Sequence, residues 1–123
     1  MRRALAIVLS LVSAQAGAAV PLKHGLFVDH RERCSAGHGY LYYEFDGRHL
    51  SYGAPPISEE LKRVSAAEYV GEHRSDSGAL VRDHLTIKSP AEFVWSNAEG
   101  TFRMRYCPES SLPKSWRGHH NSN

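Results

Sequence analysis

Histidine is the residue type in this sequence with the widest chemical range, because imidazole binds zinc, copper and nickel and also acts as a base near neutral pH. The 123 residues contain eight histidines: His24, His30, His38, His49, His73, His84, His119 and His120. No HExxH motif occurs, and no two histidines stand two residues apart, the spacing that puts both on one face of a strand. We therefore expect solvated histidines, no metal and no cofactor, with a histidine-based metal site and a pH-sensing role as the alternatives.

Catalysis by a hydrolase would need a nucleophile beside a histidine that an acid orients. Asp29-His30 and Asp83-His84 each put an acid next to a histidine. Adjacent residues of a strand point to opposite faces, so neither pair orients its own imidazole. No Gly-x-Ser-x-Gly motif is present. We expect that the protein is not an enzyme, and a small hydrolase is the weakest alternative.

The N-terminal residues have the three parts of a secretory signal peptide. Arg2 and Arg3 are basic, an apolar run extends from Ala4 to Val12, and small-x-small sites end at Ala16 and Ala18. A bilayer span needs about 20 apolar residues, more than this run supplies. The sequence predicts that residues 1–18 are cleaved, that the protein is exported, periplasmic or secreted, and that no membrane span remains.

The formal charge of +2 depends on the signal segment. Without Arg2 and Arg3, 13 basic residues would balance 13 acidic residues. Nucleic-acid binding normally needs an excess of Lys and Arg on one face. We therefore expect no nucleic-acid partner.

Cys34 and Cys107 are the only two cysteines. In an oxidising compartment an even pair indicates a disulfide. The bond would enclose 72 intervening residues, for which chain entropy gives a stabilisation on the order of 4 kcal/mol. Free thiols are the alternative, but no CxxC motif supports them.

Alternation of apolar and polar residues predicts an all-β domain over residues 19–107, a small antiparallel barrel or sandwich of about six or seven short strands. A serine followed by two acids at Ser58-Glu59-Glu60 predicts at most one short helical turn. Residues 108–123 are predicted to form a flexible tail from which Trp116 docks. The predicted strands are 25–29, 40–46, 48–52, 63–74, 79–88, 92–96 and 101–107.

Two hairpins give predicted registers. Asp46-Gly47 is typical of a two-residue turn, which would pair Tyr43 with Leu50 and Glu44 with His49. The loop 97–100 would pair Ser96 with Thr101 and each preceding residue in turn, so that Glu92 faces Arg105. The predicted core is Leu41, Tyr43, Leu50, Leu85, Ile87, Phe93, Trp95, Phe102 and Met104.

A candidate binding surface lies on the opposite face of these strands. Exposed strand tyrosines are frequent at recognition surfaces, and arginines on one face can meet carboxylates. The alternatives are that the Cys34 loop or the tail covers the tyrosines, and that Glu92 pairs with Arg105. The surface suggests a binding protein whose partner is an unknown protein or small ligand of the cell envelope. Its candidate residues are Tyr40, Tyr42, Glu44, His49, Arg103 and Arg105.

Export makes a direct prediction about the mature N-terminus. Cleavage after Ala16 or Ala18 would leave Gly17 or Ala19 as the first residue. The intact mass of protein recovered from the envelope or medium of expressing cells tests this. Recovery of the chain with Met1 or Arg2 still in place would contradict the assignment.

Overall fold

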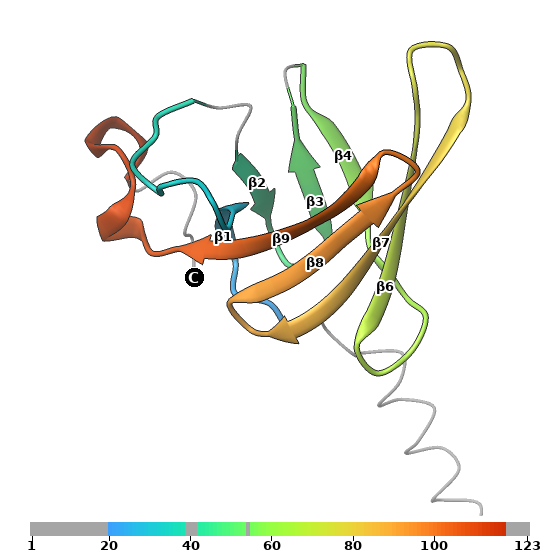
Figure 1. The fold of residues 1–123 in the computed structure, drawn as a ribbon, viewed down its shortest axis with the longest axis horizontal. Helices are drawn as coiled ribbons and strands as arrows, with labels where there is room; N and C mark the ends of the chain where they lie inside the picture. Colours follow the sequence, from blue (N-terminus) through green and yellow to red (C-terminus); the bar gives the residue numbers. More distant parts are fainter. Residues whose placement is uncertain (1–19, 39–41, 54, 118–123) are drawn as a thin grey trace, which may run out of the picture.

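The computed structural model describes residues 20–38, 42–53 and 55–117 (Figure 1). The predicted signal segment, Tyr40 and Leu41 therefore lie outside the described residues. Two 3-10 turns, η2 (Glu109–Ser111) and η3 (Lys114–Trp116), follow the strands. The strands are β1 (Gly25–Asp29), β2 (Tyr42–Phe45), β3 (His49–Tyr52), β4 (Ile57–Glu60), β5 (Lys62–Arg63), β6 (Glu68–Arg74), β7 (Leu80–Ser89), β8 (Glu92–Asn97) and β9 (Gly100–Cys107).

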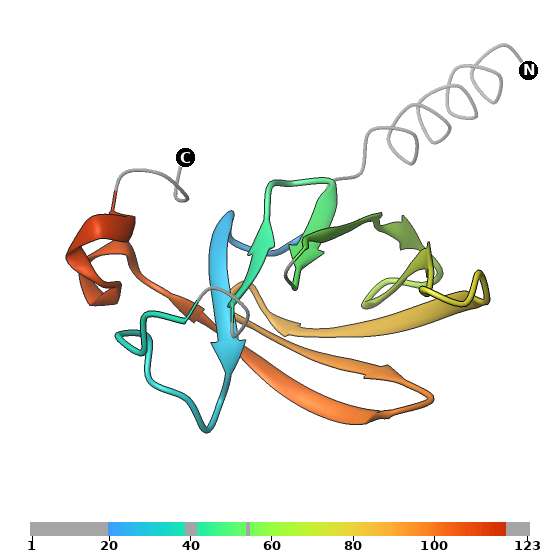
Figure 2. The same ribbon diagram turned by 90° about the horizontal axis from the view of Figure 1, so that it is seen from above.

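All these strands belong to one antiparallel sheet in the order β4-β3-β2-β1-β9-β8-β7-β6-β5. The sheet curls into a nearly closed barrel, and Figure 2 shows the strands surrounding a common interior. The predicted all-β fold is confirmed. Within the described ranges, no helix has the length and apolar character needed to cross a bilayer.

A strand that changes its partner closes the barrel. β4 pairs with β3, and after Leu61 the same stretch of chain continues as β5, which pairs with β6 at Tyr69 and Val70. No strand pairing joins β4 to the 71–74 half of β6 among the described residues. Side chains meet across this gap, and we call it the seam. A hollow lined by Glu60, Lys62, Val70 and Glu72 lies at the seam.

The helical turn predicted at Ser58-Glu59-Glu60 is wrong, because this segment is β4. Its acids resemble a helix start locally, but pairing with β3 sets the backbone and sends Glu59 to the buried face and Glu60 to the exposed face. Tertiary pairing here overrides local propensity. Together with β5, which was also not predicted, β4 raises the strand count from six or seven to nine.

The two predicted hairpin registers differ in outcome. In β8–β9 the pairs run from Ser96 opposite Thr101 to Glu92 opposite Arg105, which confirms the prediction. In β2–β3 the predicted register is wrong by two residues, because Phe45 pairs with Leu50 and Tyr43 with Tyr52.

The side chain of Asp46 explains the longer β2–β3 turn. Its Oδ1 atom accepts hydrogen bonds from the backbone N–H groups of Arg48 at 2.9 Å and His49 at 2.7 Å. Aspartate commonly stabilises turns in this way. A shift of two residues keeps the phase of the strand, so Tyr43 and Leu50 still point to the barrel interior as predicted.

The barrel interior holds most of the predicted core. Phe27, Phe45, Leu50, Leu85, Phe93, Trp95 and Met104 are among its buried residues, and Tyr43, Ile87 and Phe102 are partly buried against them. Every one of the predicted core residues that the structure describes is therefore in contact with this cluster. Leu41 lies outside the described residues.

A second apolar cluster lies on the outer face of β1. Leu26 and Val28 point away from the barrel, so β1 is buried on both faces, consistent with its continuous apolar run. The disulfide Cys34–Cys107 lies in this cluster, with 5.5 Å between the Cα atoms, and confirms the predicted pairing. Leu112, between the two 3-10 turns, is also buried there, within the segment predicted to be a tail.

Loss of the disulfide should destabilise the fold. We expect the double variant Cys34→Ala/Cys107→Ala to lose on the order of 4 kcal/mol of unfolding free energy, because a large loop is no longer closed in the unfolded chain. Urea titration measures this loss. The control is the wild-type protein under reducing conditions, which should show the same midpoint as the variant. Equal midpoints for the oxidised wild type and the variant would refute the expected contribution.

Candidate functional site

The described members of the predicted binding surface are held in local contacts. Tyr42 is only 3% exposed, because the Cys34 loop and Trp116 cover it. Its hydroxyl donates to the carbonyl oxygen of Cys34 at 2.6 Å and accepts from the N–H of Gly37 at 3.1 Å. Of the two alternatives, the covered face is the one found at Tyr42. Trp116 contacts Tyr42 with ring centroids 4.5 Å apart, as docking of that residue predicted.

The charged members of the surface form separate pairs. Arg103 bonds Glu92 at 2.8 Å, whereas Arg105 donates to the carbonyl oxygen of Glu32 and lies 3.3 Å from Cys34 Sγ. The expected Glu92–Arg105 ion pair is therefore wrong, because the Cys34 loop offers Arg105 a nearer acceptor. His49 lies 3.4 Å from Asp46.

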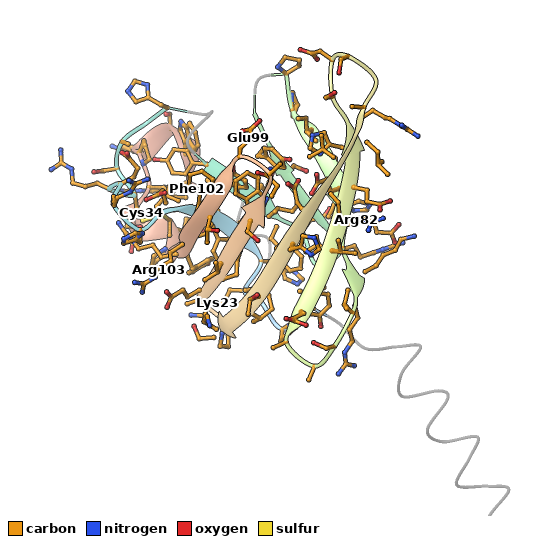
Figure 3. The ribbon with its side chains drawn as sticks, turned by 45° about the vertical axis from the view of Figure 1, so that its right-hand side comes forward. Lys23, Cys34, Arg82, Glu99, Phe102 and Arg103 are labelled. Carbon is orange, nitrogen blue, oxygen red and sulfur yellow. A yellow bond between two sulfur atoms is a disulfide. The ribbon has the colours of Figure 1, made fainter. Side chains whose placement is uncertain are left out.

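The predicted Glu44–His49 pairing is also wrong, because the observed register places Glu44 opposite Ser51. Figure 3 shows Arg82 and Arg103 on different sides of the barrel. Arg82 pairs there with Glu72 across β6–β7, at 2.7 Å. The outer face therefore carries cross-strand ion pairs of the kind that contribute little to stability.

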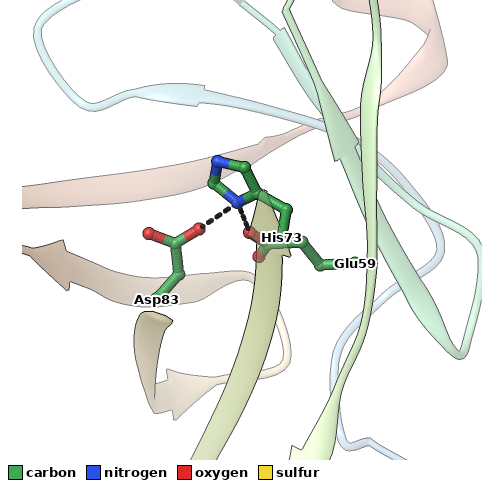
Figure 4. Close-up of side chains that lie close together, drawn as sticks. All are labelled: Glu59, His73 and Asp83. Carbon is green, nitrogen blue, oxygen red and sulfur yellow. Dashed lines mark hydrogen bonds and ion pairs between the residues drawn. The ribbon is translucent and has the colours of Figure 1, made fainter. Parts of the chain in front are cut away.

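A different set of polar side chains meets inside the barrel. Glu59 on β4, His73 on β6 and Asp83 on β7 form the acid–imidazole cluster, which is drawn in Figure 4. Tyr52 on β3 and Asn97 on β8 contact it. Each residue occupies an inward position of its strand, in phase with apolar neighbours, so closure of the barrel brings five strands to one point.

The imidazole of His73 lies between the two acids. Its Nδ1 atom forms a close hydrogen-bond contact with Glu59 Oε2 and lies 3.6 Å from Asp83 Oδ2. The hydroxyl of Tyr52 donates to Asp83 Oδ2 at 2.8 Å and lies 3.2 Å from Glu59 Oε2. Asn97 donates from Nδ2 to the other oxygen of Asp83 at 2.8 Å. Asp83 is therefore fixed at both oxygens.

Burial dominates the electrostatics of the cluster. The side chains of Glu59 and Asp83 are 0% exposed, and that of His73 is 14% exposed. Loss of hydration, followed by the nearby Asp83 carboxyl group, raises the pKa of Glu59 to about 9. Burial and then the hydrogen bond to Asp83 raise the pKa of Tyr52, which keeps its hydroxyl protonated as a donor.

One oxygen of Glu59 has no hydrogen-bond partner. Glu59 Oε1 is buried and lies against Gly71. A Cβ atom at position 71 would stand 2.7 Å from this oxygen and 2.9 Å from Glu59 Cβ, so only glycine leaves room for Glu59 across the seam. An unsatisfied buried acceptor is costly in a folded protein and requires an explanation.

Aromatic rings pack beside the polar cluster. Tyr43 stacks on Tyr52 with ring centroids 4.7 Å apart, and Trp95 lies 5.6 Å from Tyr43 and 5.1 Å from Phe102. Burial, followed by the carboxylates of the cluster, raises the pKa of Tyr43 to about 12. The rings make this end of the interior a region of low polarity, which strengthens the electrostatic interactions of the cluster.

The cluster has the residue types of a metal site. One ligand atom from each of Glu59, His73 and Asp83 lies within 4.8 Å of the other two. In the described part of the chain, this is the group of histidine, cysteine and acidic residues that is close enough to hold an ion, and it contains a single histidine. A group that brings several histidines together is not found among those residues.

Sequence reasoning did not find this cluster, although one signal was present. Asp83 stands two residues before Leu85, and His73 stands four residues after Tyr69, so both share the phase of buried apolar residues. A polar residue at an inward position is unusual and could have marked both. Glu59 gave no such signal because its segment resembled a helix start.

Comparison with known proteins provides no further guide to the site. No protein family matches the chain, and neither a curated protein nor a solved structure is similar to it.

The raised pKa of Glu59 predicts how stability changes with pH. The folded state keeps a proton on Glu59 up to a pKa of about 9, whereas the unfolded chain releases it near 4.5. The folded state therefore binds more protons between these values, so the free energy of unfolding should fall as pH rises from 5 to 9. Glu59→Gln should flatten this fall, as measured by urea titration at several pH values.

The neighbouring acid on the same strand supplies a matched control. Glu60 is exposed, and Arg48 lowers its pKa, so its titration lies below this window. Glu60→Gln should therefore keep the wild-type slope between pH 5 and 9. A Glu59→Gln slope equal to that of wild type would contradict the assignment.

Proposed function

We propose that this chain is an exported, non-catalytic binding protein and that the acid–imidazole cluster binds a small cationic ligand. The observation that carries the proposal is the burial of Glu59 and Asp83 inside the barrel beside the partly buried imidazole of His73. Replacing a buried polar group of this kind with apolar side chains is often neutral or stabilising. Its presence in a small core is therefore better explained by binding than by stability.

The charge and size of the cluster favour a small cation. Two carboxyl groups face one imidazole, and Glu59 Oε1 still lacks a partner. A barrel of this size holds its own side chains or one small ligand. Because aromatic rings already pack beside the cluster, a compact cation fits better than an extended organic molecule or a protein partner.

Two further features support export and a role without catalysis. A structural disulfide is typical of proteins from oxidising compartments, in agreement with the predicted signal segment. The side chains in contact with His73 in the cluster are carboxyl groups and a tyrosine hydroxyl. A hydrolase would instead need an activated nucleophile at this position.

Ligand-induced thermal stabilisation tests the proposal. The oxidised protein is heated in the presence of divalent metal ions, spermidine or choline, at constant ionic strength and pH. A ligand at 100 times its Kd should stabilise the folded state by about 2.7 kcal/mol. We expect at least one cation to raise the Tm of wild type and of Glu60→Gln, and to leave the Tm of Glu59→Gln unchanged.

Two results would refute the proposal. One is that no cation in the panel changes the Tm of wild type. The other is that Glu59→Gln responds to every active cation as strongly as Glu60→Gln does, which would place binding outside the cluster. Circular dichroism of each variant establishes that it has the wild-type fold before the comparison is made.

A further inference from the structure

We infer that the ligand of the acid–imidazole cluster is a divalent transition-metal ion, held by a carboxylate oxygen of Glu59, Nδ1 of His73 and a carboxylate oxygen of Asp83. This inference rests on the proposed function and names the ligand of the same site. It differs from a histidine-rich site, because two of the three protein ligands are acids from separate strands.

The positions of the three side chains fit a shared ion. Metal–ligand distances of about 2.0–2.2 Å place neighbouring ligand atoms about 3–4.4 Å apart. Asp83 Oδ2 and His73 Nδ1, at 3.6 Å, already have such a separation. Figure 4 shows one ring nitrogen of His73 facing both carboxyl groups and the other pointing away from them. Glu59 is nearer to the imidazole, so its flexible side chain would withdraw as the ion enters.

The unpartnered oxygen of Glu59 is the second observation that points to an ion. Glu59 is fully buried, belongs to the cluster, and has an Oε1 atom without a hydrogen bond. A cation bound by the Glu59 carboxylate would compensate this group, either through both oxygens or after rotation of the carboxylate. No preformed cavity is required, because the ion would enter between side chains that now contact one another, as Glu59 withdraws from His73.

The neighbours of Asp83 are arranged as an outer shell. Asn97 donates to Oδ1, and Tyr52 donates to Oδ2, so the carboxylate is oriented from two strands. Ligating carboxylates in metal sites are commonly held by hydrogen bonds of this kind, which tune affinity. Tyr52 and Asn97 are therefore positioning residues: Asn97 acts through Asp83, and Tyr52 acts through Asp83 and also lies beside Glu59 and His73.

The donor set selects the class of ion. One imidazole nitrogen and two carboxylate oxygens suit Zn²⁺ or Mn²⁺, whereas soft ions such as Cu⁺ prefer sulfur. Both cysteines are in the disulfide, so no thiolate competes. Ca²⁺ and Mg²⁺ take oxygen ligands, so the imidazole disfavours them. The usual order of affinities then predicts tighter binding of Zn²⁺ than of Mn²⁺, and weak binding of Mg²⁺.

Calorimetric titration of the oxidised, chelator-treated protein with Zn²⁺ tests the inference. We expect one site per chain in wild type and at least tenfold weaker binding in Glu59→Gln, His73→Gln and Asp83→Asn. The matched controls are Glu60→Gln and His84→Gln, which change exposed neighbours of Glu59 and Asp83 and should keep the wild-type affinity. Co²⁺ provides a second readout, since its visible absorption spectrum should indicate nitrogen ligation in wild type and lose that signature in His73→Gln.

The possible failures are distinguishable from one another. Equal Zn²⁺ affinity in His73→Gln and His84→Gln would place the ion on other histidines and overturn the inference. Stabilisation by spermidine or choline that depends on Glu59, without Zn²⁺ binding, would overturn the metal and leave the proposed function standing. Failure of every cation to bind at the cluster would remove both.

Discussion

Closure of the barrel across the seam between β4 and β6 is the constraint on which the rest of the structure depends. On the edge of β6 that faces the seam, backbone pairing is made only by β5, at Tyr69 and Val70, so the seam beside residues 71–74 is closed by side chains. Glu59 crosses it, lies against the backbone of Gly71 and pairs with His73. The contact that completes the barrel is therefore also the one that assembles its polar interior.

This arrangement links a cost in stability to a capacity for binding. Two buried carboxyl groups and an imidazole are an expensive way to fill a small core. The surrounding strands reduce the cost by fixing Asp83 with Tyr52 and Asn97, but they leave Glu59 Oε1 without a partner. A site preorganised on strands, rather than on loops, holds its ligand atoms close together before any ligand arrives.

The outer face of β1 stabilises the barrel through the second apolar cluster and the disulfide. The Cys34 loop and the 3-10 turns cover Leu26, Val28 and Tyr42, and the disulfide holds that loop to the end of β9. This covering also removes two residues from the predicted binding surface. Tyr42 is buried beneath it, and Arg105 is held in a hydrogen bond to the Cys34 loop. Among the described residues, the polar groups best placed to bind a ligand are consequently those of the acid–imidazole cluster inside the barrel.

The sequence by itself determined what depends on local pattern. This comprises the all-β class, the β8–β9 register, the strand residues that point into the core and the Cys34–Cys107 pairing. Period-two alternation and an even cysteine pair in a predicted export context carry that information. Only the tertiary structure decided that Glu59 lies in a strand and that Tyr42 is covered. It alone brought Glu59 to His73 and Asp83, because β6 and β7 pair as a hairpin but β4 meets them only through closure of the sheet, which no local pattern encodes.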